Sequence, residues 1–89
     1  MTEHKITVKS VDMSEAMQNE IVALASKAFD ENKLEKDIAA HVKREADRQF
    51  GPTWHVVVGR NFGSYVTHET GNFIYFYVDH TAVLLFKSG

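Results

Sequence analysis

Residues 73–78 carry large apolar side chains on both faces of the strand that they are expected to form. Side chains alternate across a strand, so three aromatic residues face one way and three apolar residues face the other. The first set is Phe73, Tyr75 and Tyr77, and the second is Ile74, Phe76 and Val78. Residues 83–86 repeat this pattern. A sheet with one solvated face would alternate apolar and polar residues instead, so both faces of this sheet must be covered.

Two amphipathic helices are predicted ahead of these strands. The first begins after Asp12 or Ser14, either of which is a suitable N-cap, and ends near Asn32. The second has Asn32 as its expected N-cap, with Glu35 three residues later, and a glycine–proline pair after residue 50 ends it. Each helix has apolar residues at steps of three and four, opposite a charged face. Because each helix has one solvent-exposed face, the two helices cover only one side of a sheet.

Runs of period two predict five strands, at residues 6–11, 54–59, 62–67, 72–78 and 82–87. The connections between the later strands are short, which implies antiparallel neighbours. The two-residue link at Arg60 and Asn61 also permits its strands to separate instead of pairing. The expected fold is therefore α+β, with two helices packed on a five-strand antiparallel sheet, in a single domain of residues 1–89.

The uncovered face of the sheet predicts a second copy of the chain. The 89 residues contain no cysteine, so neither disulfides nor thiolate metal clusters stabilise so small a core. Hydrophobic residues make up 44% of the sequence, which is too many for a disordered chain. A second sheet packed against the first is the simplest cover. We therefore expect a homodimer, sheet against sheet.

The predicted strand at residues 62–67 differs from the others. It is the least apolar, its Gly63 and Ser64 allow another backbone to approach closely, and it has no proline or lysine to block an edge. These features fit an edge that a partner's extended segment joins as an added strand. An ordinary edge strand explains them too, so the residues alone leave both interpretations open.

Composition argues against several other classes of protein. The net charge is −2 and the basic residues are dispersed, which disfavours nucleic acids and anionic membranes as partners. No apolar run approaches the roughly 20 residues of a membrane span, and the first residues do not resemble a signal peptide, so a cytosolic protein is expected. The five histidines lack metal-ligand spacing, so no metal or cofactor is expected. A small enzyme and a purely structural dimer remain the alternatives to a binding protein.

Four sequence blocks carry a resemblance to a known family. They are KDIAAH at residues 36–41, PTWH at 52–55, VGRNFGSYVTHET at 58–70 and LLFKSG at 84–89. Together they resemble the cytoplasmic dynein light chain of the small, dimeric hub type, over the whole chain. The resemblance implies that strand 62–67 is exchanged into the other subunit's sheet, which creates two equivalent grooves. It further implies that the grooves bind short disordered segments, often with a Thr-Gln-Thr core, from the dynein intermediate chain and other clients.

The resemblance also implies which residues take part. The peptide-binding set is Glu35, Lys36, Arg60, Asn61, Phe62, Gly63, Ser64, Tyr65, Val66, Thr67, His68, Phe73, Tyr75, Tyr77 and Leu84. In this set, the N–H groups at Glu35 and Lys36, where the second helix begins, donate to the glutamine of the client motif. The dimer-interface set is Trp54, His55, Val58, Phe62, Tyr65, Thr67, Phe86 and Ser88. The implied function is a bivalent, non-enzymatic hub in the cytoplasm, associated with the cytoskeleton and a motor, that promotes dimerisation of its clients.

Overall fold

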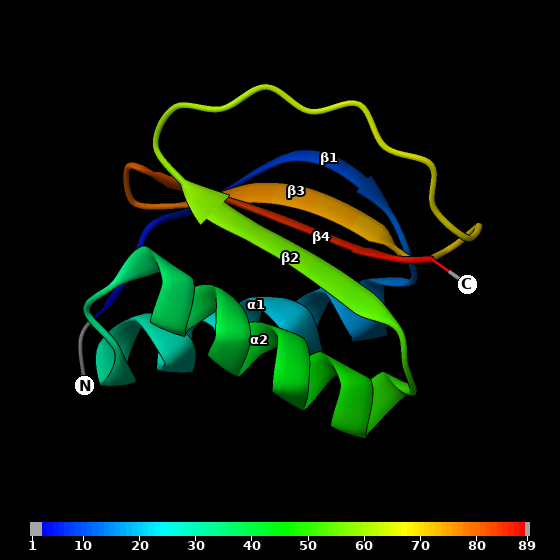
Figure 1. The fold of residues 1–89 in the computed structure, drawn as a ribbon, viewed down its shortest axis with the longest axis horizontal. Helices are drawn as coiled ribbons and strands as arrows, with labels where there is room; N and C mark the ends of the chain where they lie inside the picture. The colour runs from blue at the N-terminus through cyan, green and yellow to red at the C-terminus, as the bar shows by residue number, and fades with distance from the viewer. Residues whose placement is uncertain (1–2, 89) are drawn as a thin grey trace.

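A twisted sheet lies over a layer of two helices, as Figure 1 shows. The computed structural model describes residues 3–88, so Met1, Thr2 and Gly89, which ends the last sequence block, lie outside the described residues. In chain order the elements are β1 (Ile6–Asp12), α1 (Glu15–Glu31), α2 (Glu35–Phe50), β2 (Trp54–Gly59), β3 (Phe73–Val78) and β4 (Thr81–Lys87). The strands pair antiparallel in the order β1-β3-β4-β2. The predicted α+β class, with two helices and an antiparallel sheet, is confirmed.

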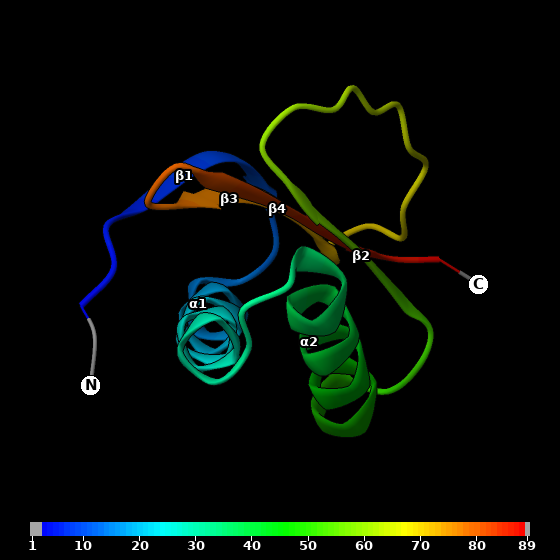
Figure 2. The same cartoon turned by 60° about the vertical axis from the view of Figure 1, so that its left-hand side comes forward.

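Strand β3 has the predicted alternation. Ile74, Phe76 and Val78 are at most 1% exposed, whereas the three aromatic residues between them are half-buried. The buried side chains pack against apolar residues of both helices, namely Ile21, Ala25 and Ala28 of α1 and Ile38, Val42 and Ala46 of α2. Figure 2 shows the helices side by side beneath the sheet. We call the covered side of the sheet the helix face and the other side the outer face.

The helix ends agree with the sequence at three of four points. Ser14 caps α1, since its Oγ accepts a hydrogen bond from the Met17 N–H at 3.2 Å. Gly51, with φ of 79°, follows the last residue of α2 as predicted. The prediction that Asn32 caps α2 was wrong. Asn32 instead ends α1, where its Nδ2 donates to the Ala28 carbonyl at 2.9 Å, and α2 begins after Leu34 without a side-chain cap.

The prediction of a fifth strand at residues 62–67 was wrong for the single chain, because the sheet has four strands. Residues 60–72 form an extended arm that arches above the outer face, on the side away from the helices (Figure 1). The physical reason is that a strand needs a neighbouring backbone to pair with, and residues 62–67 find none within the described part of their own chain. We refer to residues 60–72 as the arm.

Asp47 joins α2 to the start of β2. Its Oδ1 accepts the Trp54 N–H at 2.8 Å, and its Oδ2 pairs with Lys43, whose Nζ also donates to the Trp54 carbonyl at 2.9 Å. The bond from Lys43, followed by the bond from the Trp54 N–H, lowers the pKa of Asp47. The carboxylate therefore stabilises the fold at neutral pH, and this contribution is lost as the pH falls through the lowered pKa.

We expect Asp47→Ala to destabilise the chain by about 1–3 kcal/mol, because it leaves the partly buried Trp54 N–H without its acceptor. Urea unfolding at pH 7, followed by the fluorescence of the single tryptophan, measures this loss. Glu45→Ala is the matched control on the same helix, since it removes a carboxylate whose main partner is the exposed Arg48 and should cost less. Equal losses in the two variants would contradict the proposed role of Asp47.

Candidate protein-binding site

The outer face of the sheet is apolar and has no helix over it (Figure 2). Three rows of paired residues cross it from β2 through β4 to β3, namely His55–Phe86–Phe73, Val57–Leu84–Tyr75 and Gly59–Ala82–Tyr77. Leu84, in the middle of the face, is only 2% exposed, whereas Val57 at the β2 edge is 41% exposed. The uncovered apolar surface is therefore concentrated toward β2, which is an edge strand.

The arm touches the outer face mainly near its two ends. At the first end, the rings of Phe62 and Tyr75 lie 6.4 Å apart. At the second end, His68 stacks on Phe73 with ring centroids 4.7 Å apart. Between these anchors, the Tyr65 side chain is fully exposed, and a Cβ added at Gly63 would meet nothing within 4 Å. The middle of the arm is therefore free to make contacts outside its own chain.

The two edges of the sheet differ in how open they are to a further strand. Strand β1 has a register shift between Val8 and Ser10, and Lys9 lies within that bulge. Bulges and lysines are features that block an edge. Strand β2 pairs with β4 through six consecutive residues without a shift, and it contains neither lysine nor proline. Among residues 3–88 no strand pairs with its other side, so β2 is the open edge.

A cavity of about 570 Å³ lies at the N-terminus of α2. It is lined by Phe29, Asn32, Lys33, Leu34, Glu35, Ile38, Arg60 and Thr81. The Leu34 side chain has no acceptor atom, so the first N–H groups of the helix, at Glu35 and Lys36, have no side-chain cap. Uncapped N–H groups and the positive end of the helix dipole favour a carbonyl or an anionic oxygen from another molecule.

A smaller cavity of about 110 Å³ lies between the start of the arm and the sheet. Its lining is Arg60, Asn61, Phe62, Tyr75, Tyr77 and Ala82, so five of its six residues belong to the peptide-binding set predicted from the sequence. Arg60 lines this cavity and also the cavity at α2. Lys36 and the residues of the arm between Gly63 and Thr67 line neither cavity.

The tyrosines of the outer face present hydroxyl groups beside this smaller cavity. The rings of Tyr75 and Tyr77 are 6.0 Å apart, and the neighbouring Tyr77 hydroxyl, together with burial, raises the pKa of Tyr75. The Tyr75 phenol is therefore neutral at physiological pH and can donate or accept a hydrogen bond. The ammonium of Lys9 lies 5.6 Å from the centre of the Tyr77 ring.

Trp54 and Val58, two members of the dimer-interface set, lie on the helix face of β2. Trp54 is fully buried in the helix-side core, with its ring 6.1 Å from that of Phe50, and Val58 packs against the same core. The physical reason is the alternation along β2, which turns these residues toward the helices and turns His55 and Val57 toward the outer face. Trp54 has no exposed surface left for a second copy, so we reassign it to the core, whereas Val58 is only partly buried and stays in the proposed interface set.

Sequence reasoning missed several residues of these surfaces. Leu34 stands four residues before Ile38, a spacing that predicts a buried side chain, yet it is 58% exposed because it precedes the first turn of α2. The error follows from the role of Asn32, which caps the end of α1 and not the start of α2. Leu34 therefore takes the N-cap position just before α2 begins. Val57 was also missed, although alternation places it on the same face as His55, which was in the dimer-interface set.

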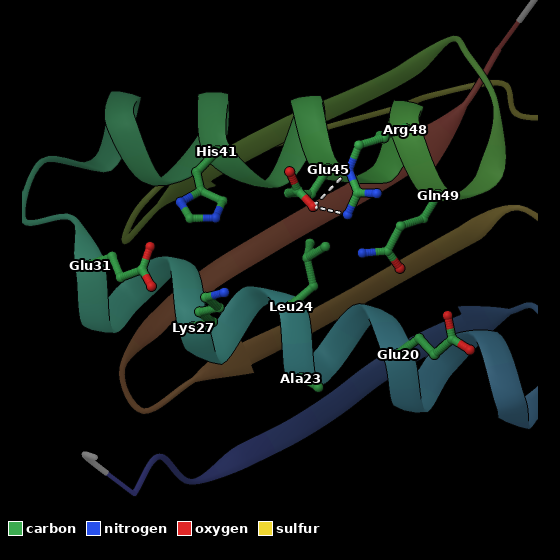
Figure 3. A pocket seen from close by; sticks show the side chains of 9 residues that line it. All are labelled: Glu20, Ala23, Leu24, Lys27, Glu31, His41, Glu45, Arg48 and Gln49. Carbon is green, nitrogen blue, oxygen red and sulfur yellow. Dashed lines mark hydrogen bonds and ion pairs between the residues drawn. The ribbon is translucent and has the colours of Figure 1, made fainter.

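A third cavity, of about 690 Å³, lies elsewhere, between α1 and α2 (Figure 3). Two of its charged groups pair with each other, since Arg48 donates to Glu45 at 2.6 Å. His41, which also lines it, accepts at Nδ1 a hydrogen bond from the Asn32 amide nitrogen at 3.0 Å. None of the predicted site residues lines it. It therefore adds nothing to the surfaces on the other side of the molecule.

Residues 3–88 show neither a metal site nor a membrane-spanning helix. No three side chains of His, Asp or Glu in this range converge in an arrangement that would hold a metal ion. Neither helix in the same range combines the length and the apolar character that crossing a bilayer requires. The geometry instead offers an open strand edge, a free arm and an apolar face, which are the elements of binding by strand addition.

Comparisons with known proteins agree with this architecture. The family model described as Dynein light chain type 1 matches residues 5–88. A Schistosoma mansoni protein named Dynein light chain is 60% identical over 89 residues, which is 100% of both chains.

Two solved structures share the fold at 22% identity. The dynein light chain-like domain of the Fasciola hepatica calcium binding protein FhCaBP2 has a TM-score of 0.82 and covers 98% of this chain and 94% of its own. The DLC-like domain of CsTAL3 has a TM-score of 0.76, with 93% and 92% covered. On the family match and the full-length relative, this chain belongs to the dynein light chain family.

Proposed function

We propose that this chain is a non-enzymatic hub that forms a homodimer by exchanging its arm and captures short linear motifs as added strands. Membership of the dynein light chain family supports a dynein-associated role. The family also favours the cytoplasm and the cytoskeleton as its place of action. Exchange of the arm and capture of motifs are the finer parts of the proposal, and they rest on the geometry of the described residues.

The observation that carries the proposal is an extended arm without a strand partner beside an open strand edge. Residues 62–67 make no backbone ladder within the chain, and β2 has one unpaired edge. If the arm of each copy adds to β2 of the other, both sets of unpaired backbone groups gain partners. The exchange also brings apolar side chains over the exposed Val57. The remaining proposed interface residues are His55, Val58, Phe62, Tyr65, Thr67, Phe86 and Ser88.

An exchanged arm keeps a second edge, and we assign that edge to the client. An extended segment that pairs with it would pass the aromatic residues of the outer face and approach the N-terminus of α2. The uncapped N–H groups at Glu35 and Lys36 would then donate to the side-chain carbonyl of a glutamine, as in a Thr-Gln-Thr core. The proposed peptide-binding set is unchanged from that given by the sequence.

A dimer of this kind has two equivalent grooves. Two copies of one client, once bound, are held close together, and capture of the second is intramolecular. Avidity for a dimeric client then exceeds the affinity of one groove. The partners that follow are a second copy of the chain, the dynein intermediate chain and other disordered clients with similar motifs.

Titration with a disordered peptide that contains Thr-Gln-Thr tests the capture of motifs. We expect saturable binding of one peptide per chain by calorimetry, and about tenfold weaker binding of a peptide with alanine for glutamine, since one buried hydrogen bond is lost. No binding at millimolar peptide would refute motif capture. Sedimentation of the same sample tests the dimer separately, so a dimer without peptide binding would support the alternative of a purely structural homodimer.

A further inference from the structure

His4 lies between two carboxylates from different parts of the fold. Its Nε2 is 2.8 Å from Asp30 Oδ1, near the end of α1, and its Nδ1 is 2.9 Å from Asp79 Oδ2, in the turn between β3 and β4. The His4 side chain is only 10% exposed, and its ring lies 6.1 Å from that of Phe29. One side chain thus links the N-terminal segment, α1 and the β3–β4 turn.

The geometry of these two contacts specifies the charge of the ring. A neutral imidazole has one N–H donor, and an ionised carboxylate only accepts hydrogen bonds. Both contacts are hydrogen bonds at the same time only when both ring nitrogens carry protons, which makes His4 a cation between two anions. Loss of one proton would leave a nitrogen lone pair facing a carboxylate oxygen at under 3 Å. One of the two contacts must then break.

The neighbouring backbone strengthens the link to the turn. Asp79 Oδ1 accepts the Lys5 N–H at 2.9 Å, and the Asp79 N–H donates to the Lys5 carbonyl at 2.8 Å. Asp79 has φ of 56°, the left-handed region that aspartate and asparagine tolerate better than most residues. His80, which follows Asp79 in the same turn, is a further titratable side chain that acts on its carboxylate. The Asp79 carboxylate is therefore shared between His4 and the Lys5 backbone.

We propose that doubly protonated His4 is a latch that fastens the N-terminal segment and the β3–β4 turn to α1, and that the latch opens when the ring loses a proton. None of its residues belongs to the proposed peptide-binding or dimer-interface sets. The latch therefore changes the stability of the fold, and its residues are separate from the proposed groove and from the arm that is exchanged.

The direction of the pH dependence follows from the contacts. The bonds to Asp79 and then to Asp30 raise the pKa of His4 above its ordinary value of 6.5. Its contribution to stability is complete below the unfolded value and is lost as the pH rises through the raised pKa. The bond from His4 lowers the pKa of Asp79 below 3.8, so that contribution is lost as the pH falls through the lowered value. The latch is closed in mildly acidic solution and opens in alkali and in strong acid.

Nuclear magnetic resonance on the full-length protein measures both halves of the proposal. We expect the His4 ring to titrate above pH 6.5, and Asp79→Asn to lower its midpoint while keeping an oxygen for the Lys5 N–H. Amide exchange gives the protection factor of Lys5, which is corrected for the intrinsic rise of exchange with pH. We expect this factor to fall about tenfold or more as His4 loses its proton.

His4→Gln and His80→Gln form the matched pair of variants. His4→Gln removes the cation and should abolish the pH-dependent step in Lys5 protection. His80→Gln changes the histidine next to Asp79 in the β3–β4 turn and should leave the step in place. A His4 midpoint at or below 6.5, or a Lys5 step that persists in His4→Gln, would overturn the latch. The titration of the parent protein needs no variant, so the proposal is testable even if a substitution disturbs folding.

Discussion

Gly63→Pro should leave the chain folded but monomeric at concentrations where the parent protein forms the proposed dimer. In the single chain Gly63 belongs to no ladder, and a Cβ there meets nothing within 4 Å, so the fold loses no contact. In the proposed dimer the same residue lies in an exchanged strand, where proline removes an N–H donor and fixes φ. The substitution therefore separates the stability of the fold from the stability of the assembly.

The expected effect is large because a symmetric dimer contains the change twice. A loss of roughly 1–3 kcal/mol at each arm gives about 2–6 kcal/mol in total, which raises the dissociation constant by roughly 30-fold to 10⁴-fold. Sedimentation over a range of concentrations measures this change, and circular dichroism reports whether the helices persist. Gly63→Ala keeps the N–H and should remain dimeric. A dimeric Gly63→Pro protein with an unchanged dissociation constant would refute exchange of the arm.

Phe76→Ala and Tyr77→Ala should have opposite consequences although the two residues are neighbours in β3. Phe76 is fully buried on the helix face, and its truncation should destabilise the fold by about 3–5 kcal/mol. A domain of this size has only about 5–15 kcal/mol in total, so the variant should be close to unfolding. Tyr77 is half-buried on the outer face, so its truncation should spare the fold and weaken the binding of a Thr-Gln-Thr peptide.

Urea unfolding at one fixed protein concentration and calorimetric titration with the peptide measure the two effects. The expected pattern is a crossed one, in which Phe76→Ala lowers the unfolding midpoint and Tyr77→Ala lowers the affinity. Similar losses of stability in the two variants would show that the outer face is a second part of the core. Unchanged affinity in Tyr77→Ala would remove this residue from the peptide-binding set.

The sequence was most informative where the pattern depends only on local geometry. Alternation in β3 predicted which side chains share a face, because the period of a strand is fixed by its backbone. Gly51 was also predictable, since few other residues adopt its positive φ at the end of a helix.

Prediction failed where two helices compete for the same capping residue. It also failed where the sequence does not reveal which strand or helix a segment packs against. Asn32 has the chemistry of an N-cap, but the sequence does not reveal that its amide bonds to the preceding helix. Residues 62–67 have the composition of a strand, but composition does not state which sheet a strand joins. Trp54 alternates with His55 in either orientation, and only the packing of α2 decides which of them faces the helices.

The bulge in β1 has a consequence for how many molecules can associate. In the proposed dimer with exchanged arms, the free edges are those of the two β1 strands and those proposed for clients. An unbroken β1 edge would let one dimer extend the sheet of the next, which is the route to fibres and precipitates. The register shift at Lys9 interrupts that edge and places a charge on it. In the proposed dimer, the edges for clients therefore stay open while the β1 edges do not recruit a further dimer.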